Sequence, residues 1–450
     1  MKREEAAADG ERPSWLMALL SRAIDIERGE VAAVLGSFAT FALVLAGYYL
    51  IRPVRENISA EATADQRQMW FLLVFLVMLA IVPLFGWIVA RVPRRAVLPG
   101  MYAVFIVLMA VFWVALDGSG PLSGAFFVFA SVFNLFVVSL FWILMSDLYD
   151  SGQAKRLYGF IAAGGTAGAV LGPAAANVLA PLIGARHLLL VAAGLIACAA
   201  VLSIWLRTLG ERGNANTTGA DAPATLRTLL SGAERVLRDP YLLRIAAYVL
   251  IANLLSTFFY LEQSRLAGAT IPDAGARVLF FAERDLITSV LTVLVQLLVT
   301  GPIMSRLGIG VAASVLPALT IAGLGIYAAW PELHVVAAIM VAERVAAFAL
   351  SNPATKVLYT AVDSDERYKA QSFIDTVVYR GGDALSGAVF NGLTKSMGWP
   401  LALVATASIP IAALWLAISA RFDKALEQRL AETAPREGLQ KSHGRLVGQP

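Results

Sequence analysis

The chain has 450 residues, of which 58% are hydrophobic and only 15% are charged. A soluble protein carries about a quarter charged residues, so this composition indicates a polytopic membrane protein. The net charge of +4 is too small and too scattered for nucleic-acid binding. The single cysteine, Cys198, excludes an intrachain disulfide, and three widely separated histidines argue against a histidine/cysteine metal site. We expect neither a metal nor a cofactor.

Residues 1–29 lack the apolar core of a signal peptide, so we expect them to stay in the cytoplasm. From Trp15 to Ile26, apolar residues recur at helical spacing among charged ones, which is typical of a short interfacial helix. An amphipathic turn without a role at the lipid surface is an equally good interpretation.

Apolar runs of about twenty residues, bounded by charges, glycines or prolines, predict transmembrane helices. Twelve such runs lie at 30–52, 69–90, 97–116, 123–147, 157–181, 184–206, 241–261, 279–303, 309–329, 335–360, 371–396 and 400–421. The predicted fold is therefore all-α, with twelve transmembrane helices.

The predicted spans divide into an N-terminal half, residues 30–206, and a C-terminal half, residues 241–421. Residues 207–240 form a polar linker with a surface helix, and residues 422–450 form a tail. Thirteen basic residues fall in loops on the linker side, against seven on the opposite side. The excess predicts that the linker, the tail and both termini are cytoplasmic. We also expect the protein to lie in a bacterial inner membrane.

The two halves repeat short sequence patterns. Gly86-x4-Arg91 closes the second span, and Gly301-x4-Arg306 closes the eighth. The dipeptide Phe-Ile opens both the fifth span, at position 160, and the eleventh, at position 373. Two nearly equal offsets favour duplicated six-helix halves, an arrangement that transporters use.

The loop after the second span reads Gly86-Trp-Ile-Val-Ala90-Arg91-Val-Pro93-Arg94-Arg95. It resembles the G-x-x-x-D-R-x-G-R-K loop of the major facilitator superfamily, with alanine where that pattern has aspartate. The resemblance implies a gating role for the loop, and a positive-inside anchor is the alternative interpretation. The expected gating set, in which the two acids near span 4 can pair with the arginines, is Arg91, Arg94, Arg95, Asp147 and Asp150.

Three longer segments carry a closer resemblance. Residues 48–56 read YYLIRPVRE, residues 154–159 read AKRLYG, and residues 373–383 read FIDTVVYRGGD. These resemble the ATP/ADP translocase (nucleotide carrier) family, and in particular its relatives in free-living bacteria. The resemblance implies a transporter fold and nucleotide substrates. It also implies a substrate-binding role for Arg55, which matches a basic residue of that family.

Charged residues inside spans 10 and 11 are the strongest candidates for a site. A charge at bilayer depth costs a few kcal/mol or more, so such residues usually face a cavity or a partner. Arg380 lies about 15 Å along span 11 at 1.5 Å per residue. The candidates at this level are Glu343, Arg344, Asp375, Arg380 and Asp383. A purely structural ion-pair network between the two spans is the alternative.

The residue types suggest different roles for these side chains. Arg344 and Arg380 are permanently charged forks suited to phosphate or carboxylate. Glu343, Asp375 or Asp383 can take up and release protons in a poorly solvated cavity, or can simply neutralise the arginines.

Two further groups lie toward the outer ends of spans. Arg52 and Arg55, near the end of span 1, are predicted to bind substrate, and snorkelling to lipid headgroups is the alternative. Glu283, Arg284 and Asp285, toward the outer part of span 8, are predicted to line or gate an outer vestibule.

Gly164, Gly168 and Gly172 occur at four-residue spacing within span 5. Their surroundings lack the lysine and strand of a phosphate-binding loop, so the spacing predicts close helix packing instead. The sequence contains no Walker motif and no nucleophile–base pair, so we do not expect an enzyme. A nucleotide would be cargo rather than fuel.

Together these features predict a major facilitator fold that works by alternating access. The expected substrate is an organic anion, with a nucleotide or another phosphorylated metabolite as examples, and protons and membrane lipid are further expected partners. A zwitterion or an amphipathic lipid is the alternative substrate. A non-transporting sensor or scaffold is the alternative function, and it predicts that the midplane charges pair completely.

Overall fold

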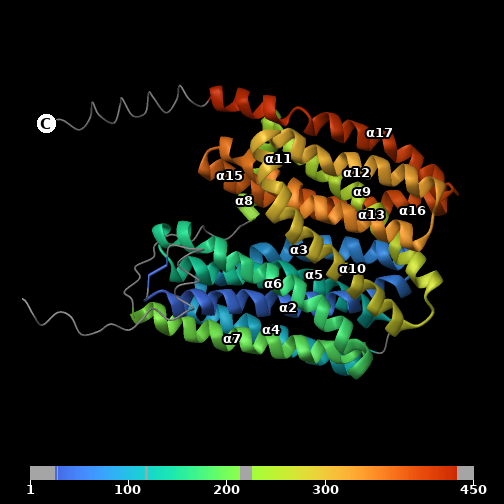
Figure 1. Cartoon of the computed structure of the whole chain (residues 1–450). Coiled ribbons are helices and arrows are strands. Elements are labelled where there is room, and N and C mark those ends of the chain that lie inside the picture. The colour runs from blue at the N-terminus through green and yellow to red at the C-terminus, as the bar shows by residue number, and fades with distance from the viewer. Residues whose placement is uncertain (1–25, 28, 117–119, 213–225, 433–450) are drawn as a thin grey trace, which may run out of the picture.

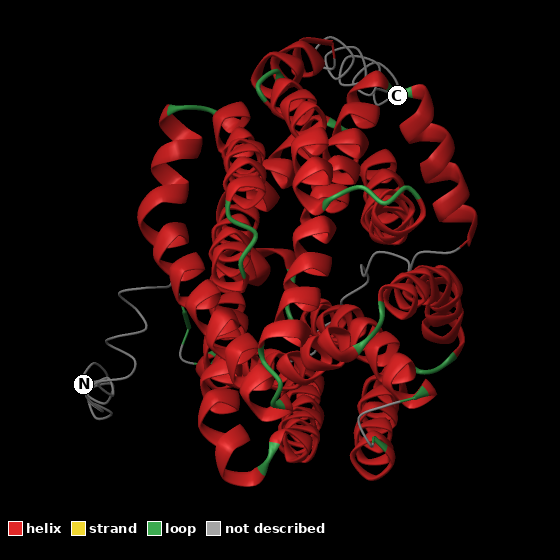
Figure 2. Cartoon of the chain, turned by 90° about the vertical axis from the view of Figure 1, so that its right-hand side faces the viewer, coloured by secondary structure: helices red, strands yellow, loops and turns green. Residues whose placement is uncertain are grey.

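The computed structural model describes residues 26, 27, 29–116, 120–212 and 226–432. Within these ranges all regular structure is helical (Figure 2). The interfacial helix expected before Ile26 and the last part of the tail lie outside the described residues.

The N-terminal half contains six long helices. They are α2 (Val31–Glu61), α3 (Ala64–Arg91), α4 (Arg94–Ala115), α5 (Pro121–Leu148), α6 (Ser151–Ile183) and α7 (Leu188–Arg212), with the short 3-10 turn η1 (Ala185–His187) before α7. Local chemistry sets several of their ends. Capping boxes start α3 at Thr63 and α6 at Asp150, where each side chain accepts from a backbone N–H that has no helical partner.

The C-terminal half is built from more broken helices. They are α9 (Pro240–Thr270), α10 (Ala274–Val295), α11 (Gly301–Arg306), α12 (Ile309–Ala329), α13 (Leu333–Ala346), α14 (Asn352–Leu358), α15 (Ser364–Phe373), α16 (Tyr379–Asn391) and α17 (Leu401–Ser419). Wide π-helical turns interrupt the eighth, tenth and eleventh crossings at η2 (Gln296–Thr300), η3 (Ala347–Ser351), η5 (Ile374–Val378) and η6 (Gly392–Ser396), and a 3-10 turn, η4 (Tyr359–Ala361), follows α14. Such turns are frequent at functional sites and hinges.

Eleven helical segments of the described chain are long and apolar enough to cross a membrane. The predicted span at 371–396 is not among them because charged and polar residues lower its hydropathy. Two crossings that also contain π turns, Ala274–Arg306 and Leu333–Ala361, are among them. The main helix of the span at 371–396, α16, packs between α9 of its own half and α3 of the other. It therefore completes the twelve-helix, two-half fold.

Small residues bring α2 and α6 together. A Cβ atom on Gly164 or Gly168 would collide with the carbonyl oxygens of Phe38 and Ala42 on α2. At Gly172 it would lie 2.8 Å from the oxygen of Ala46. The prediction of close packing through the glycine series is confirmed.

The two halves lie one above the other in Figure 1, with the linker helix α8 (Leu226–Arg238) beside α15. A Cβ on Gly232 would collide with the backbone of Lys369, and Arg235 of α8 pairs with Glu366 of α15. The linker helix is thus fixed to the C-terminal half. We call the side of the molecule that holds α8 the linker side, and the opposite side the far side.

Polar contacts fasten the halves together at the far side. Arg277 of α10 donates to Asn57 Oδ1 of α2 over 2.7 Å and pairs with Glu61. Ser59 and Ser264 are joined by a hydrogen bond of 3.3 Å between α2 and α9. On the linker side, prominent ion pairs stay within one half: Glu30 with Arg156, and Asp239 with Arg429.

Candidate functional site

Asp285 of α10 gathers three arginines from three helices. Its Oδ2 lies 3.5 Å from Arg52 Nε on α2, across the boundary between the halves. Its Oδ1 lies 2.7 Å from Arg284 Nη2 and 3.3 Å from Arg344 Nη1, which comes from α13. We call Arg52, Arg284, Arg344 and Asp285 the arginine cluster. All four were candidates from the sequence.

The cluster carries three guanidinium groups and one carboxylate, and the Asp285 side chain is fully buried. The other hydrogen-bond partner of Arg284 is neutral, because Gln263 Oε1 accepts from it. Burying charge is expensive unless opposite charge compensates it. The cluster is therefore a buried site with surplus positive charge.

Arg55 and Glu56 extend the cluster along α2. Glu56 Oε1 lies 3.7 Å from both Arg52 Nε and Arg55 Nη1. The Arg55 guanidinium also lies 4.2 Å from the ring centre of Phe127, close enough for a cation–π contact. Glu56 is 1% exposed, and neither carboxylate oxygen has a hydrogen-bond partner among the described residues.

Sequence analysis missed Glu56 as a site residue. Its signal was present, because it follows Arg52 by four positions and so shares a helix face with it.

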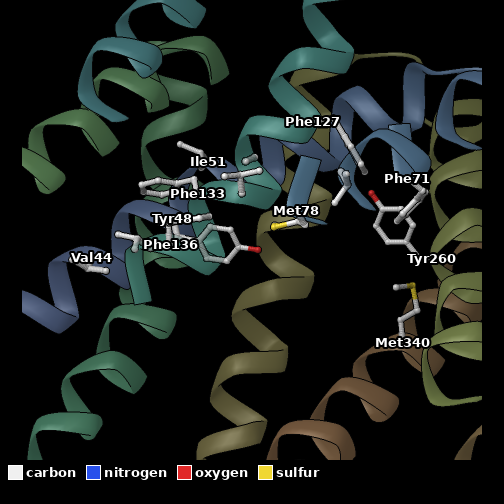
Figure 3. Close-up of a cluster of buried hydrophobic side chains, with 14 of the residues drawn as sticks. Val44, Tyr48, Ile51, Phe71, Met78, Phe127, Phe133, Phe136, Tyr260 and Met340 are labelled. Carbon is white, nitrogen blue, oxygen red and sulfur yellow. The ribbon is translucent and has the colours of Figure 1, made fainter. Parts of the chain in front are cut away.

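Aromatic rings from both halves meet beside Arg55. Tyr260 of α9 lies edge-on to Phe71 of α3, with 5.6 Å between ring centres, and Phe71 contacts Phe127 of α5 in the same way. Figure 3 shows these three rings together, with Tyr48 farther away, beside Phe133 and Phe136. The cluster thus opens onto apolar, aromatic surroundings rather than onto a loop.

Arg380 belongs to a second, smaller group on α16 and α9. Its Nη1 lies 3.4 Å from Asp383 Oδ2, and Asp383 Oδ1 accepts from Thr257 over 3.1 Å. Asn253 of α9 donates to the Tyr379 carbonyl over 2.6 Å. The Arg380 side chain is 20% exposed, so it is held within the bundle beside its own acid.

Three acids predicted as site residues, Glu343, Asp375 and Glu283, lie outside both groups. Glu343 is buried but accepts from Thr320 of α12 over 2.5 Å, away from its neighbour Arg344. Asp375 pairs with Lys356 at 3.2 Å, and both are more than half exposed. Glu283 lies on the exposed face of α10. The five charged candidates of spans 10 and 11 are therefore divided among separate contacts.

The residues of the linker-side loops divide among separate contacts. Asp147 pairs with Arg207 at 3.4 Å, and Asp150 caps α6 by accepting from two backbone N–H groups. The Arg91 guanidinium lies 4.5 Å from the ring centre of Trp87. The side chains of Arg94 and Arg95 lie outside the described residues.

A further buried acid, Glu262, lies at the far side. Glu262 accepts from Tyr327 over 2.5 Å and pairs with Arg265 at 2.9 Å. Together with the contacts of Arg277, it keeps the far ends of α9 and α10 in place.

Two bundles of six helices, with buried charges where they meet, define a membrane transporter rather than an enzyme. Comparison with known families agrees, because residues 37–282 match the Major Facilitator Superfamily. The chain belongs to this superfamily. No curated protein matches the sequence.

Solved structures show the same fold at low identity. A POT family transporter in complex with a thioalcohol-conjugated peptide has a TM-score of 0.63 and 12% identity, covering 86% of this chain and 96% of that one. The nucleoside transporter NupG has a TM-score of 0.58 and 14% identity, and the match covers 90% of this chain and 99% of that one. A bacterial homologue of the iron transporter ferroportin, in an inward-facing state, has a TM-score of 0.57 and 14% identity. The match covers 90% of this chain and 98% of that one.

Proposed function

We propose that this protein is a secondary active transporter that binds an organic anion at the arginine cluster and moves it by alternating access. The observation that carries the proposal is the sharing of one buried carboxylate, Asp285, among three guanidinium groups, those of Arg52 and Arg284 buried and that of Arg344 half-buried. A permanent surplus of buried positive charge is unfavourable in the empty protein. A bound anion supplies the missing negative charge.

Unpaired hydrogen-bond donors support the same proposal. Arg55 Nε and Gln263 Nε2 are buried and have no hydrogen-bond partner among the described residues. Arg52 Nε makes only a long contact of 3.5 Å with Asp285. A phosphate or carboxylate can accept from such donors, and guanidinium groups bind these anions in a two-pronged geometry. A scaffold or sensor would favour complete pairing of these buried groups. Their incomplete pairing therefore supports a binding site.

The substrate class we favour is a nucleotide or another phosphorylated metabolite. Two of the segments that resemble the ATP/ADP translocase family carry the charges described above, namely residues 48–56 and 373–383. Aromatic rings near Arg55 offer surfaces on which a planar base can stack, at about 1–3 kcal/mol per base.

The far-side contacts support alternating access. Arg277, Ser59 and Ser264 join the halves on that side. If the linker and both termini are cytoplasmic, in a bacterial inner membrane, these contacts close the periplasmic side, which alternating access requires in one of its states. Protons are a candidate for coupling, and the buried acids Glu56 and Asp383 are the groups we would assign to that role.

One observation favours a second substrate class. Arg380 and Asp383 form a pair of opposite charges on one face of α16, 3.4 Å apart. A zwitterion, or an amphipathic lipid with a zwitterionic headgroup, could separate this pair and bind to both members.

Counterflow in proteoliposomes tests the proposal. Purified protein is reconstituted, the vesicles are loaded in turn with nucleotides, sugar phosphates, carboxylates, zwitterions and neutral nucleosides, and exchange with the labelled compound is followed. We expect exchange only for anions. Exchange restricted to neutral or zwitterionic compounds would contradict the assignment of the arginine cluster.

A further inference from the structure

An apolar groove runs along the outside of the N-terminal half, away from the arginine cluster. Helices α3, α4 and α5 line it, and its volume is about 700 Å³. Every lining residue is aliphatic, aromatic, methionine, glycine or proline. Apolar space of this kind does not hold water.

The groove is open toward the membrane. Met69, Leu84 and Val104 line it and are 52%, 51% and 49% exposed. On α3 the lining runs from Met69 to Ile88, about 28 Å at 1.5 Å per residue. That length approaches the hydrocarbon thickness of a bilayer, about 30 Å. A chain from either leaflet can therefore lie within it.

A positive charge stands at the linker-side end of the groove. Arg91 ends α3 three positions after Ile88, the last lining residue of that helix. Its guanidinium lies over the ring of Trp87, which is itself 51% exposed. Exposed tryptophan and arginine at the end of a membrane helix are typical of the lipid headgroup level.

No acid neutralises Arg91 within the described part of the chain. Asp147 and Asp150 have the other partners given above, and residue 90 is alanine. The charge is free to attract an anion from the surrounding lipid. A basic residue near the membrane surface contributes about 1 kcal/mol to binding of anionic lipid.

We propose that this groove is a binding site for one anionic phospholipid of the linker-side leaflet. An acyl chain lies along α3, α4 and α5, and the headgroup phosphate contacts Arg91. The apolar lining of the groove suits an acyl chain. The Arg91 guanidinium at the end of the groove, which has no acidic partner among the described residues, suits an anionic headgroup. This site is separate from the substrate site and does not depend on the transported compound.

Native mass spectrometry of the delipidated, detergent-solubilised full chain tests the site. Phosphatidylglycerol and phosphatidylcholine are added separately and bound lipids are counted. We expect one phosphatidylglycerol to bind about fivefold more tightly than phosphatidylcholine. Equal binding of the two lipids would overturn the role of Arg91.

Matched variants test separately the contribution of the groove and the contribution of the headgroup contact. Val104→Phe fills the groove, whereas Val107→Phe alters a 59% exposed valine of the same helix that does not line it. We expect only the first to abolish the site. Arg91→Gln should weaken phosphatidylglycerol binding about fivefold, and Arg306→Gln, at the equivalent place in the other half, should not. Equal effects of the two valine variants would contradict the proposal.

A photoreactive phosphatidylglycerol with a diazirine in its acyl chain provides a test that needs no variant. Peptide mapping should locate the crosslinks on the facing sides of α3, α4 and α5, around Leu84, Val104 and Val132. Crosslinks spread evenly over the exposed helices, with no preference for this groove, would overturn the site even if Val104→Phe fails to fold.

Discussion

Arg52 Nε and Asp285 Oδ2 lie 3.5 Å apart across the boundary between the two halves. Asp285 also holds Arg284 and Arg344, so one carboxylate connects the first, eighth and tenth crossings. The residue that joins the two halves at this point therefore also sets the charge of the proposed substrate site. Any movement that separates α2 from α10 must change that charge balance.

Asp285→Asn should be strongly destabilising. The substitution leaves two buried guanidinium groups and one half-buried guanidinium group without their shared carboxylate. Removing one partner of a buried pair costs about 3–5 kcal/mol. Thermal unfolding in detergent should show a lower Tm. Adding Arg52→Gln to Asp285→Asn should recover part of the loss, because it removes one uncompensated charge. A double variant as unstable as the sum of the two single variants would show that the contact is not energetically coupled.

A disulfide across the far side should stop transport. Ser59 and Ser264 Oγ atoms are 3.3 Å apart on different halves, so Ser59→Cys with Ser264→Cys should crosslink in a background that lacks Cys198. Alternating access requires this contact to open, so oxidation should abolish exchange and reduction should restore it.

A control pair lies within one half. Ser314 and Ser419 Oγ atoms are 2.9 Å apart on α12 and α17. Cysteines at these positions should crosslink without inhibition. Inhibition by both crosslinks, or by neither, would argue against separation of the halves at the far side.

Gly168→Ala should destabilise the N-terminal half. The new Cβ would collide with the Ala42 carbonyl oxygen of α2, and overpacking of this kind costs about 1–3 kcal/mol. Gly194 of α7 has nothing within 4 Å of the same position, so Gly194→Ala should be neutral or slightly stabilising. The two Tm values, measured in the same detergent, check this contrast.

The Glu30–Arg156 contact should make stability depend on acid pH. Burial opposes ionisation of Glu30, but hydrogen bonds from the Glu27 N–H, Gln153 and Arg156 outweigh it and hold the pKa of Glu30 below its ordinary value. A depressed pKa contributes stability above the ordinary glutamate range, near pH 4.3, and that contribution is lost as the pH falls through the depressed value.

Glu30→Gln removes this carboxylate and should flatten the acid side of the stability profile. Tm measured between pH 3.5 and pH 7 should fall less steeply for the variant than for the wild-type protein. Parallel profiles would show that the contact contributes nothing to folding.

Hydropathy was enough to predict the crossings because lipid requires long apolar helices whose backbone hydrogen bonds are satisfied internally. The glycine series of α6 was equally readable, since only close packing fits three glycines at four-residue spacing on an apolar helix. The main difference between the predicted and observed helices is in span 11, where the π turn at Ile374–Val378 breaks the regular α-helical phase. Asp375 lies in that turn and reaches Lys356.

The site was only partly predictable. Arg52, Arg284, Asp285 and Arg344 could be named, because charge inside a span is rare. Their meeting on one carboxylate depends on the rotation and depth of helices from both halves, which local patterns do not encode. Glu343 and Arg344 illustrate the limit: as neighbours they point about 100° apart, and nothing local says which of them reaches Asp285.

Arg344→Gln tests the central claim most directly, measured as counterflow of the best anion found for the wild-type protein. The substitution removes one guanidinium from Asp285 and leaves a shorter, neutral polar side chain. Arg306→Gln is the control at an exposed position. We predict that Arg344→Gln lowers exchange at least tenfold, about 1.4 kcal/mol, and that Arg306→Gln leaves it unchanged. Exchange of the anion at the wild-type rate in Arg344→Gln would contradict the claim that the arginine cluster binds the substrate.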